Sequence, residues 1–303
     1  MGTKTKNKIS ARARFVKACI HAMASSQLFG TKIQTGELQK RIVEPEWKCP
    51  DGCSLCRIDR KRFGMEWFAP REVGDQVVLQ LHGGGYINRL RNIYRDFAVK
   101  YSGMAEGLSV LSVDYRVAPE HPYPAALLDA IEAYRWLLEL GYSGEQIIVV
   151  GDSAGGGLAL ALSMWLRDQD MSLPGKLVLM SPWADLTASG KSYEENYHQD
   201  PMFGGSRESM IYLGVYPGEH DPMEPYISPM FGNFRGLPPM LIQAGSIEML
   251  RSDAETVAGK AGQAGCRVSL KVYPEMFHVF QMGLDLFPES AEAWQEVQEF
   301  VEA

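Results

Sequence analysis

The sequence lacks several features that would define a class of protein. It has no apolar run fit for export or for spanning a membrane, since residues 9–30 are interrupted by Arg12, Arg14, Lys17 and His21. With a net charge of −7 it also lacks a basic surface for a polyanion. No internal repeat or low-complexity linker divides it. We therefore expect a cytoplasmic protein that binds no nucleic acid and has no stable membrane anchor.

Cysteines are few, and their odd number of five does not suit a complete disulfide framework. Cys49, Cys53 and Cys56 have the spacing of an iron–sulfur ligand set, because three thiolates so placed can hold a cluster. They straddle a turn at Pro50-Asp51-Gly52, however, and no barrel pattern follows them. We therefore favour reduced, structural cysteines over an iron–sulfur centre.

What the sequence does contain is an alternation of apolar runs and helical patterns. The runs that suit buried strands are 65–69, 76–81, 109–113, 146–150, 176–180, 240–244 and 268–273, with 46–49 as a weaker eighth. The clearest helical stretches between them are 124–140, 154–167, 252–264 and 288–301. Runs of Val, Ile and Leu are typical of parallel strands covered on both faces. The order predicts a doubly wound α/β sheet, mostly parallel, with helices on both faces.

Two regions depart from this alternation, residues 1–45 and about 186–226. We expect both to contribute to a cap, the second as an insert in a catalytic domain of residues 46–303. Within the first region, an amphipathic helix is expected to dock on the body of the protein. Its apolar face comprises Phe15, Ala18, Ile20 and Met23.

The most informative segment is Gly151-Asp152-Ser153-Ala154-Gly155, which follows an apolar run and precedes a helical pattern. A serine at a sharp turn from strand to helix has its hydroxyl exposed at the end of the sheet, and the flanking glycines let strand and helix pack closely. The pattern predicts Ser153 as a nucleophile, against the alternative of an ordinary turn serine.

Such a serine needs donors for an oxyanion, a base and an acid. Gly83, Gly84 and Gly85 follow the strand at 76–81, and with the N–H of Ala154 they are expected to form the oxyanion hole.

The expected base is His278, because it follows the last strand and completes the chain order serine, acid, histidine. Glu248 and Asp253 both follow the strand at 240–244. We favour Glu248 as the acid, because Asp253 suits the first turn of a helix, but both remain candidates.

These motifs resemble the hormone-sensitive-lipase-like (bacterial family IV) esterases of the α/β-hydrolase superfamily from about residue 47 to the C-terminus. The motifs concerned are 82–86, 114–126, 151–156, 181–186 and 237–245. The resemblance implies an eight-stranded sheet, ester hydrolysis without a cofactor, a helical cap and frequent homodimers. It also implies oxyanion donors at Gly84, Gly85 and Ala154. Many members carry Asp-Pro-Leu where this chain has Glu248-Met249-Leu250, which leaves the identity of the acid open.

The prediction is a serine carboxylesterase that hydrolyses small, short-chain esters through an acyl-enzyme. A short acyl chain is expected because the insert is rich in bulky side chains: Tyr193, Tyr197, Met202, Phe203, Met210, Tyr212 and Tyr216. An amidase or lactonase using the same site, and a non-catalytic ligand-binding protein, are the alternatives. We interpret Asp114, Arg116 and Glu120 as a set of ion pairs that stabilises the loop in which these residues lie.

Overall fold

The computed structural model describes residues 9–24, 44–212 and 214–303. Its strands form one eight-stranded sheet in the order β1-β2-β4-β3-β5-β6-β7-β8. The strands are β1 (Cys53–Asp59), β2 (Gly64–Pro70), β3 (Val77–Leu81), β4 (Ser109–Asp114), β5 (Ile147–Asp152), β6 (Lys176–Met180), β7 (Met240–Gly245) and β8 (Val268–Tyr273). The pairs β1–β2 and β2–β4 are antiparallel and the remaining pairs are parallel. The prediction of a mostly parallel eight-stranded sheet is confirmed.

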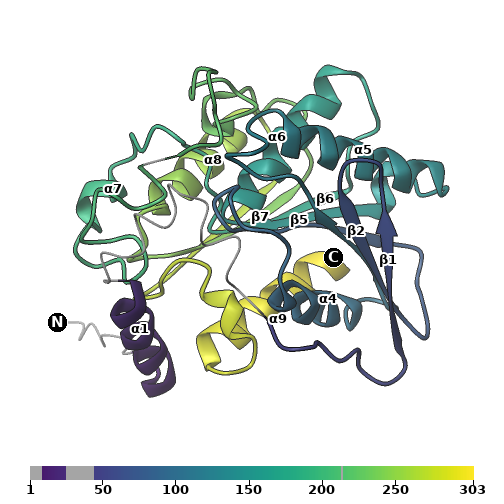
Figure 1. The fold of residues 1–303 in the computed structure, drawn as a ribbon, viewed down its shortest axis with the longest axis horizontal. Helices are drawn as coiled ribbons and strands as arrows, with labels where there is room; N and C mark the ends of the chain where they lie inside the picture. Colours follow the sequence, from purple (N-terminus) through teal and green to yellow (C-terminus); the bar gives the residue numbers. More distant parts are fainter. Residues whose placement is uncertain (1–8, 25–43, 213) are drawn as a thin grey trace.

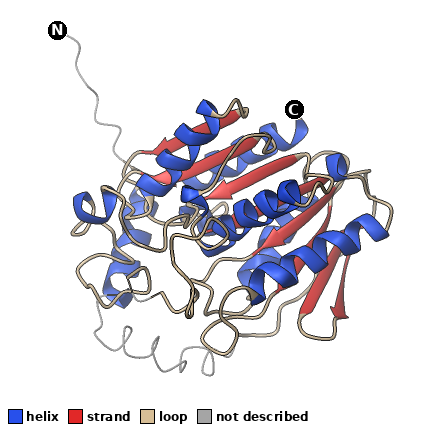
Figure 2. Cartoon of the chain, turned by 90° about the horizontal axis from the view of Figure 1, so that it is seen from above, coloured by secondary structure: helices blue, strands red, loops and turns tan. Residues whose placement is uncertain are grey.

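Helices cover both faces of this sheet (Figures 1 and 2). They are α1 (Ala11–Ala24), α4 (Asn92–Ser102), α5 (Ala125–Glu139), α6 (Ala154–Asp168), α7 (Ser192–Glu195), α8 (Arg251–Gln263) and α9 (Pro288–Glu302). One face packs on α5, α6 and α8, and the other packs on α4 and α9. Among the described residues, no helix is long and apolar enough to cross a bilayer.

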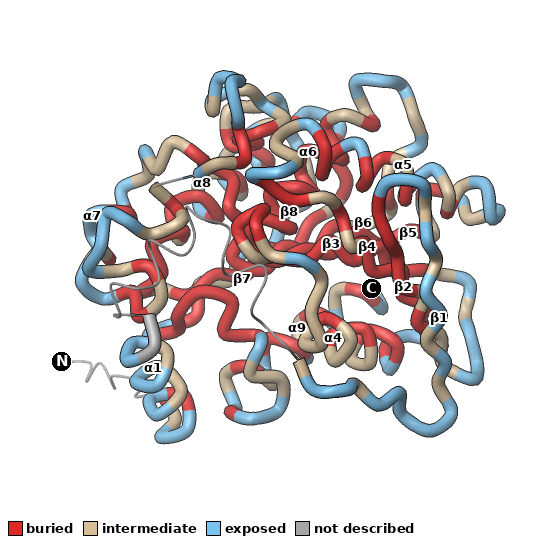
Figure 3. Tube along the Cα trace, viewed as in Figure 1, coloured by how far each residue is buried: buried red, intermediate tan, exposed pale blue. Residues whose placement is uncertain are grey.

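The central strands are buried on both sides, which explains their continuous apolar sequence. In β5, Ile147 and Val149 belong to the core shared with α5 and α6, whereas Ile148 and Val150 belong to the core shared with α4 and α9. Figure 3 shows these strands as buried backbone inside a shell of exposed loops. A strand between two helical layers has no solvent face, so its sequence does not alternate with polar residues.

The first strand was predicted in the wrong place. Residues 46–49 are irregular, and the edge strand is β1, which starts at Cys53 and pairs with β2. Most of its side chains are exposed, with only Cys53, Leu55 and Ile58 half-buried. A search for continuous apolar runs misses such a strand, because an edge strand needs to bury only one face.

The N-terminal helix docks on the body as expected, but through a different face. Ala13 is fully buried and Val16 packs beside it against a cluster that includes Phe277 and Phe280. Phe15, placed by the prediction on the docking face, is 70% exposed. Only Ile20 belongs to both the predicted and the observed face. The side chain of Met23 lies outside the described residues.

Candidate active site

Ser153 lies at the turn between β5 and α6, with an unusual positive φ of 51°. Its N–H donates to the carbonyl of Met180 at 2.9 Å, and its own carbonyl accepts from the N–H of Trp183 at 2.8 Å. A Cβ added at Gly155 would overlap the Leu81 carbonyl, so this glycine allows the first turn of α6 to lie against β3. The turn is therefore fixed on both sides of the serine.

Ser153, His278 and Glu248 form a continuous hydrogen-bonded series. Nε2 of His278 lies 2.9 Å from Oγ of Ser153, and Nδ1 lies 3.1 Å from Oε2 of Glu248. The other carboxylate oxygen of Glu248 accepts from the N–H of Gly245 at 3.2 Å. All three side chains are buried, and Glu248 has no exposed area. The geometry places an imidazole to accept the serine proton at Nε2 while the carboxylate holds the proton on Nδ1.

Asp253, the other candidate acid, takes no part in this series. Its Oδ2 accepts from the N–H groups of Ala184 and Asp185, both at 2.9 Å. Burial raises the pKa of the Asp253 carboxyl well above its usual value, and the nearby charge of Asp185 adds to the rise. Asp253 thus ties the first turn of α8 to the segment that follows β6.

The glycine loop after β3 approaches the serine turn closely. Gly84 and Gly85 have φ values of 113° and 65°. In the described part of the chain, the N–H groups of Gly84, Gly85 and Ala154 have no hydrogen-bond partner. The N–H of Gly83 instead donates to Asp152 at 2.9 Å. Gly83 was predicted as an oxyanion donor, but its N–H is already used, which leaves the other three positions as candidates.

Side chains of the insert lie against both parts of this arrangement. The ring centroid of Phe203 is 4.9 Å from that of His278. A Cβ at Gly85 would lie 2.6 Å from Sδ of Met210, so this thioether packs directly over the glycine loop. The ring of Tyr216 stacks on that of Tyr86, with 3.7 Å between the ring centroids. Apolar side chains of the insert therefore lie against both the histidine and the glycine loop.

Sequence reasoning missed the groups that support the glycine loop. His82 is fully buried, and burial lowers its pKa to about 4, so the ring is neutral. Nδ1 of this ring donates to the carbonyl of Gly83 at 2.8 Å. Tyr94 on α4 also reaches the loop. The position of His82 beside the glycines was a usable signal, whereas Tyr94 comes from a helix that the prediction did not include.

The proposed ion-pair set does not form within its own loop. Asp114 pairs with Arg89 at 2.7 Å, and Arg116 pairs with the buried Asp129 at 2.7 Å. These partners lie outside the motif, so the segment is anchored to its neighbours instead. The predicted structural role thus fits Asp114 and Arg116 with other partners, whereas Glu120 is exposed and forms no ion pair among the described residues.

The cysteines are all free thiols. Cys49 and Cys56 are exposed and Cys53 is half-buried. In the described ranges, no group of three or more His, Cys, Asp or Glu side chains is placed to hold a metal ion.

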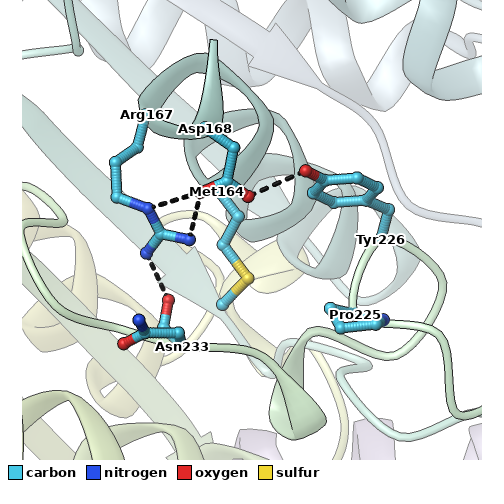
Figure 4. A pocket seen from close by; sticks show the side chains of 6 residues that line it. All are labelled: Met164, Arg167, Asp168, Pro225, Tyr226 and Asn233. Atoms are coloured by element: carbon cyan, nitrogen blue, oxygen red, sulfur yellow. Dashed lines mark hydrogen bonds and ion pairs between the residues drawn. The ribbon is translucent and has the colours of Figure 1, made fainter. Parts of the chain in front are cut away.

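A separate cavity of about 340 Å³ lies at the far end of α6 (Figure 4). Its charged groups satisfy one another, because Arg167 pairs with Asp168 and Tyr226 donates to the same carboxylate. Since α6 starts directly after Ser153 and rises about 1.5 Å per residue, this cavity is about 20 Å from the serine. It is not part of the arrangement around Ser153.

Residues 78–282 match the model of a family described by the α/β-hydrolase fold. An acetyl-hydrolase of Streptomyces hygroscopicus is 39% identical over 228 residues, which cover 75% of this chain and 76% of the relative. An esterase of Acinetobacter venetianus is 36% identical over 225 residues, covering 74% of each chain. Among solved structures, an esterase from the bacterial hormone-sensitive lipase family is similar with a TM-score of 0.83 and 34% identity, covering 97% of this chain and 98% of that one. EstE5, soaked with p-nitrophenyl butyrate, has a TM-score of 0.84 and 31% identity over 97% of this chain and 98% of that one.

Proposed function

The chain belongs to the hormone-sensitive-lipase-like esterases of the α/β-hydrolase fold, and from this premise we propose that it hydrolyses short-chain carboxylic esters with Ser153 as nucleophile. The observation that carries this proposal is the hydrogen-bonded series of Ser153, His278 and Glu248 beside a glycine loop with unpaired N–H groups. Both relatives and solved neighbours bear esterase or acetyl-hydrolase names, which supports ester bonds as the target.

In the proposed reaction, Oγ of Ser153 attacks the ester carbonyl while Nε2 of His278 takes the hydroxyl proton. The carbonyl oxygen becomes negative and is stabilised by the N–H groups of Gly84, Gly85 and Ala154. His278 then returns the proton to the leaving alcohol, and the acyl group stays on the serine. Water, deprotonated by the same imidazole, attacks the acyl-enzyme and releases the acid. Glu248 keeps the imidazole in the required tautomer throughout.

The apolar side chains of Phe203 and Met210, which lie against His278 and the glycine loop, support a preference for small acyl groups over long chains. Residues 186–226 remain our proposal for the cap insert, since these two side chains come from this region. The N-terminal part of the proposed cap, residues 1–45, lies largely outside the described residues. The free state of all five cysteines supports a reducing, cytoplasmic location. A homodimer also remains a prediction, checked by light scattering.

The test is a series of p-nitrophenyl esters from acetate to palmitate, with the matching anilide of the best acyl group. We expect the highest kcat/KM between two and six acyl carbons, and hydrolysis of the ester well above that of the amide. Ser153→Ala should lose about 10⁴-fold in kcat and all labelling by a serine-directed phosphonate, while it stays folded. An anilide preferred over the ester would identify an amidase. Absence of turnover and of labelling in the wild type would identify a binding protein.

A further inference from the structure

We propose that Asp152 and Tyr94 form a positioning pair that holds the glycine loop in the shape needed to bind an anion. This proposal rests on the hydrolase function above, because it concerns the loop assigned to the oxyanion. Neither residue is placed to touch the substrate in the proposed mechanism. Both act through the backbone of Gly83.

The contacts form a closed set around one N–H group. The N–H of Gly83 lies 2.9 Å from Oδ1 of Asp152 and 2.9 Å from the hydroxyl of Tyr94. The Tyr94 hydroxyl in turn donates to Oδ2 of Asp152 at 3.1 Å. Three separate elements thus meet here, namely the loop after β3, the end of β5 and α4. Asp152 and Tyr94 are each only 3% exposed, so water does not compete for these bonds.

The fit leaves no space for movement toward the carboxylate. A Cβ added at Gly83 would overlap Oδ2 of Asp152, so the loop backbone lies directly on this side chain. Only glycine permits that approach. Asp152, the residue before the nucleophile, therefore packs directly against the backbone of the glycine loop.

Two successive peptide planes are fixed in this way. In the plane between His82 and Gly83, the carbonyl accepts from the Tyr115 hydroxyl at 2.6 Å, and the N–H is the one bound by Asp152 and Tyr94. In the next plane, the Gly83 carbonyl accepts from the His82 ring at 2.8 Å. Because a trans peptide is planar, fixing this carbonyl also fixes the direction of the Gly84 N–H. That N–H is one of the groups left free for an oxyanion.

The contacts favour an ionised Asp152, because both groups that meet it are donors. Burial nevertheless raises the pKa of Asp152 to about 6, against the lowering effects of the Tyr94 and Gly83 bonds and of the His278 charge. Tyr101 and Tyr115 also face this carboxyl and stay neutral, since burial raises the pKa of each well above its usual value. As pH falls through about 6, Asp152 gains a proton and one of its two acceptor sites becomes a donor. The hydrogen bonding that holds the Gly83 N–H should then weaken.

The experiment compares Asp152→Asn and Tyr94→Phe with Tyr101→Phe as a matched control. Tyr101 is a buried tyrosine on the same helix as Tyr94, but within the described part of the chain only Tyr94 of these two hydrogen-bonds Gly83 and Asp152. For the first two variants we expect kcat for p-nitrophenyl butyrate to fall 10- to 100-fold with KM within about 3-fold, because the loop acts on the transition state. The control should stay close to the wild type.

The pH profile of kcat/KM separates positioning from a merely structural role. In the wild type, the acid limb should include the titration of Asp152 near pH 6. Asp152→Asn should lose this component of the limb. Tyr94→Phe should move the limb to higher pH, because it removes a hydrogen bond that stabilises the ionised carboxylate. Unchanged profiles in both variants, or losses equal to those of Tyr101→Phe, would overturn the proposal.

A second readout does not depend on esterase activity. Amide hydrogen exchange in the peptide that covers residues 82–88 should accelerate at least 10-fold in Asp152→Asn and Tyr94→Phe and not in Tyr101→Phe. If the wild type hydrolysed no ester but this exchange pattern appeared, the proposed function would fail while the positioning pair stood. Equal exchange in all three variants and the wild type would refute the pair, whatever the activity.

Discussion

Replacement of Glu248 by glutamine tests the proposed site most directly, because it removes a charge with almost no change of shape. The Glu248 carboxylate is fully buried and lies 3.1 Å from Nδ1 of His278. When His278 becomes positive during the reaction, two unit charges about 4 Å apart at an effective dielectric constant of about 20 attract each other by about 4 kcal/mol. At about 1.4 kcal/mol for each factor of ten, loss of this attraction lowers kcat about 10³-fold.

The tautomer adds to this loss. If the glutamine turns its NH₂ group toward Nδ1, the imidazole must carry its proton on Nε2, which faces Ser153 and can then accept nothing. We therefore expect kcat of Glu248→Gln to fall between about 10³- and 10⁴-fold. Stability should change by only about 1 kcal/mol, since one of two neighbouring donors, His278 or Gly245, loses its acceptor.

The assay is the steady-state release of p-nitrophenol from p-nitrophenyl butyrate, with thermal melting of each variant as the control for folding. Asp253→Asn is the matched comparison, because it also replaces a buried carboxyl by an amide in the same loop region. It should keep most of the activity. A larger loss of kcat in Asp253→Asn than in Glu248→Gln would refute the assignment of the acid.

Three further predictions follow from neighbouring side chains. Met210→Ala should move the preferred acyl chain up by about one or two carbons in the p-nitrophenyl ester series, because it opens space over Gly85; an unchanged optimum would show that Met210 does not limit the pocket. Phe203→Ala should lower kcat about 10-fold, as the His278 ring loses a packing neighbour, and should cost about 3 kcal/mol in the free energy of unfolding by urea; full activity would exclude a role for this contact. Asp253→Asn should alter the pH dependence of stability. The raised pKa of Asp253 means that the folded state retains a proton that the unfolded state loses above about 3.8. Wild-type stability should therefore fall relative to the variant as pH rises above about 4; parallel curves of the free energy of urea unfolding against pH would contradict this.

Continuous apolar sequence predicted the buried half of the fold well. The strands β3 to β8 begin and end within two residues of the expected positions. Of these, β3 to β7 are covered on both faces and admit few polar residues, whereas the edge strand β8 is only half-buried. The edge strand β1 and the docking face of α1 were misplaced, since each buries only part of its surface. In such elements the apolar signal is short, and its phase is set by the partner surface, which the sequence alone does not reveal.

In the site, too, some residues could be predicted from the sequence and others could not. Ser153, His278 and Glu248 lie together as the order along the chain led us to expect, because parallel strands bring their carboxyl ends to one edge of the sheet. Their catalytic roles stay predictions until the variants are measured. The support from Tyr94 had no motif to reveal it, since that residue comes from a helix elsewhere in the chain and its role depends on packing across β3 and β5.

The positive φ of Ser153 is a backbone conformation that is unfavourable for any residue with a side chain. Side chains with a Cβ adopt such a conformation at a cost of about 1–3 kcal/mol, whereas glycine adopts it freely. Ser153→Gly should therefore unfold at a higher urea concentration than the wild type, although it has no nucleophile. A lower midpoint would show that the hydroxyl contributes more stability than the backbone loses. If the gain appears, selection for activity and selection for stability act in opposite directions at this residue.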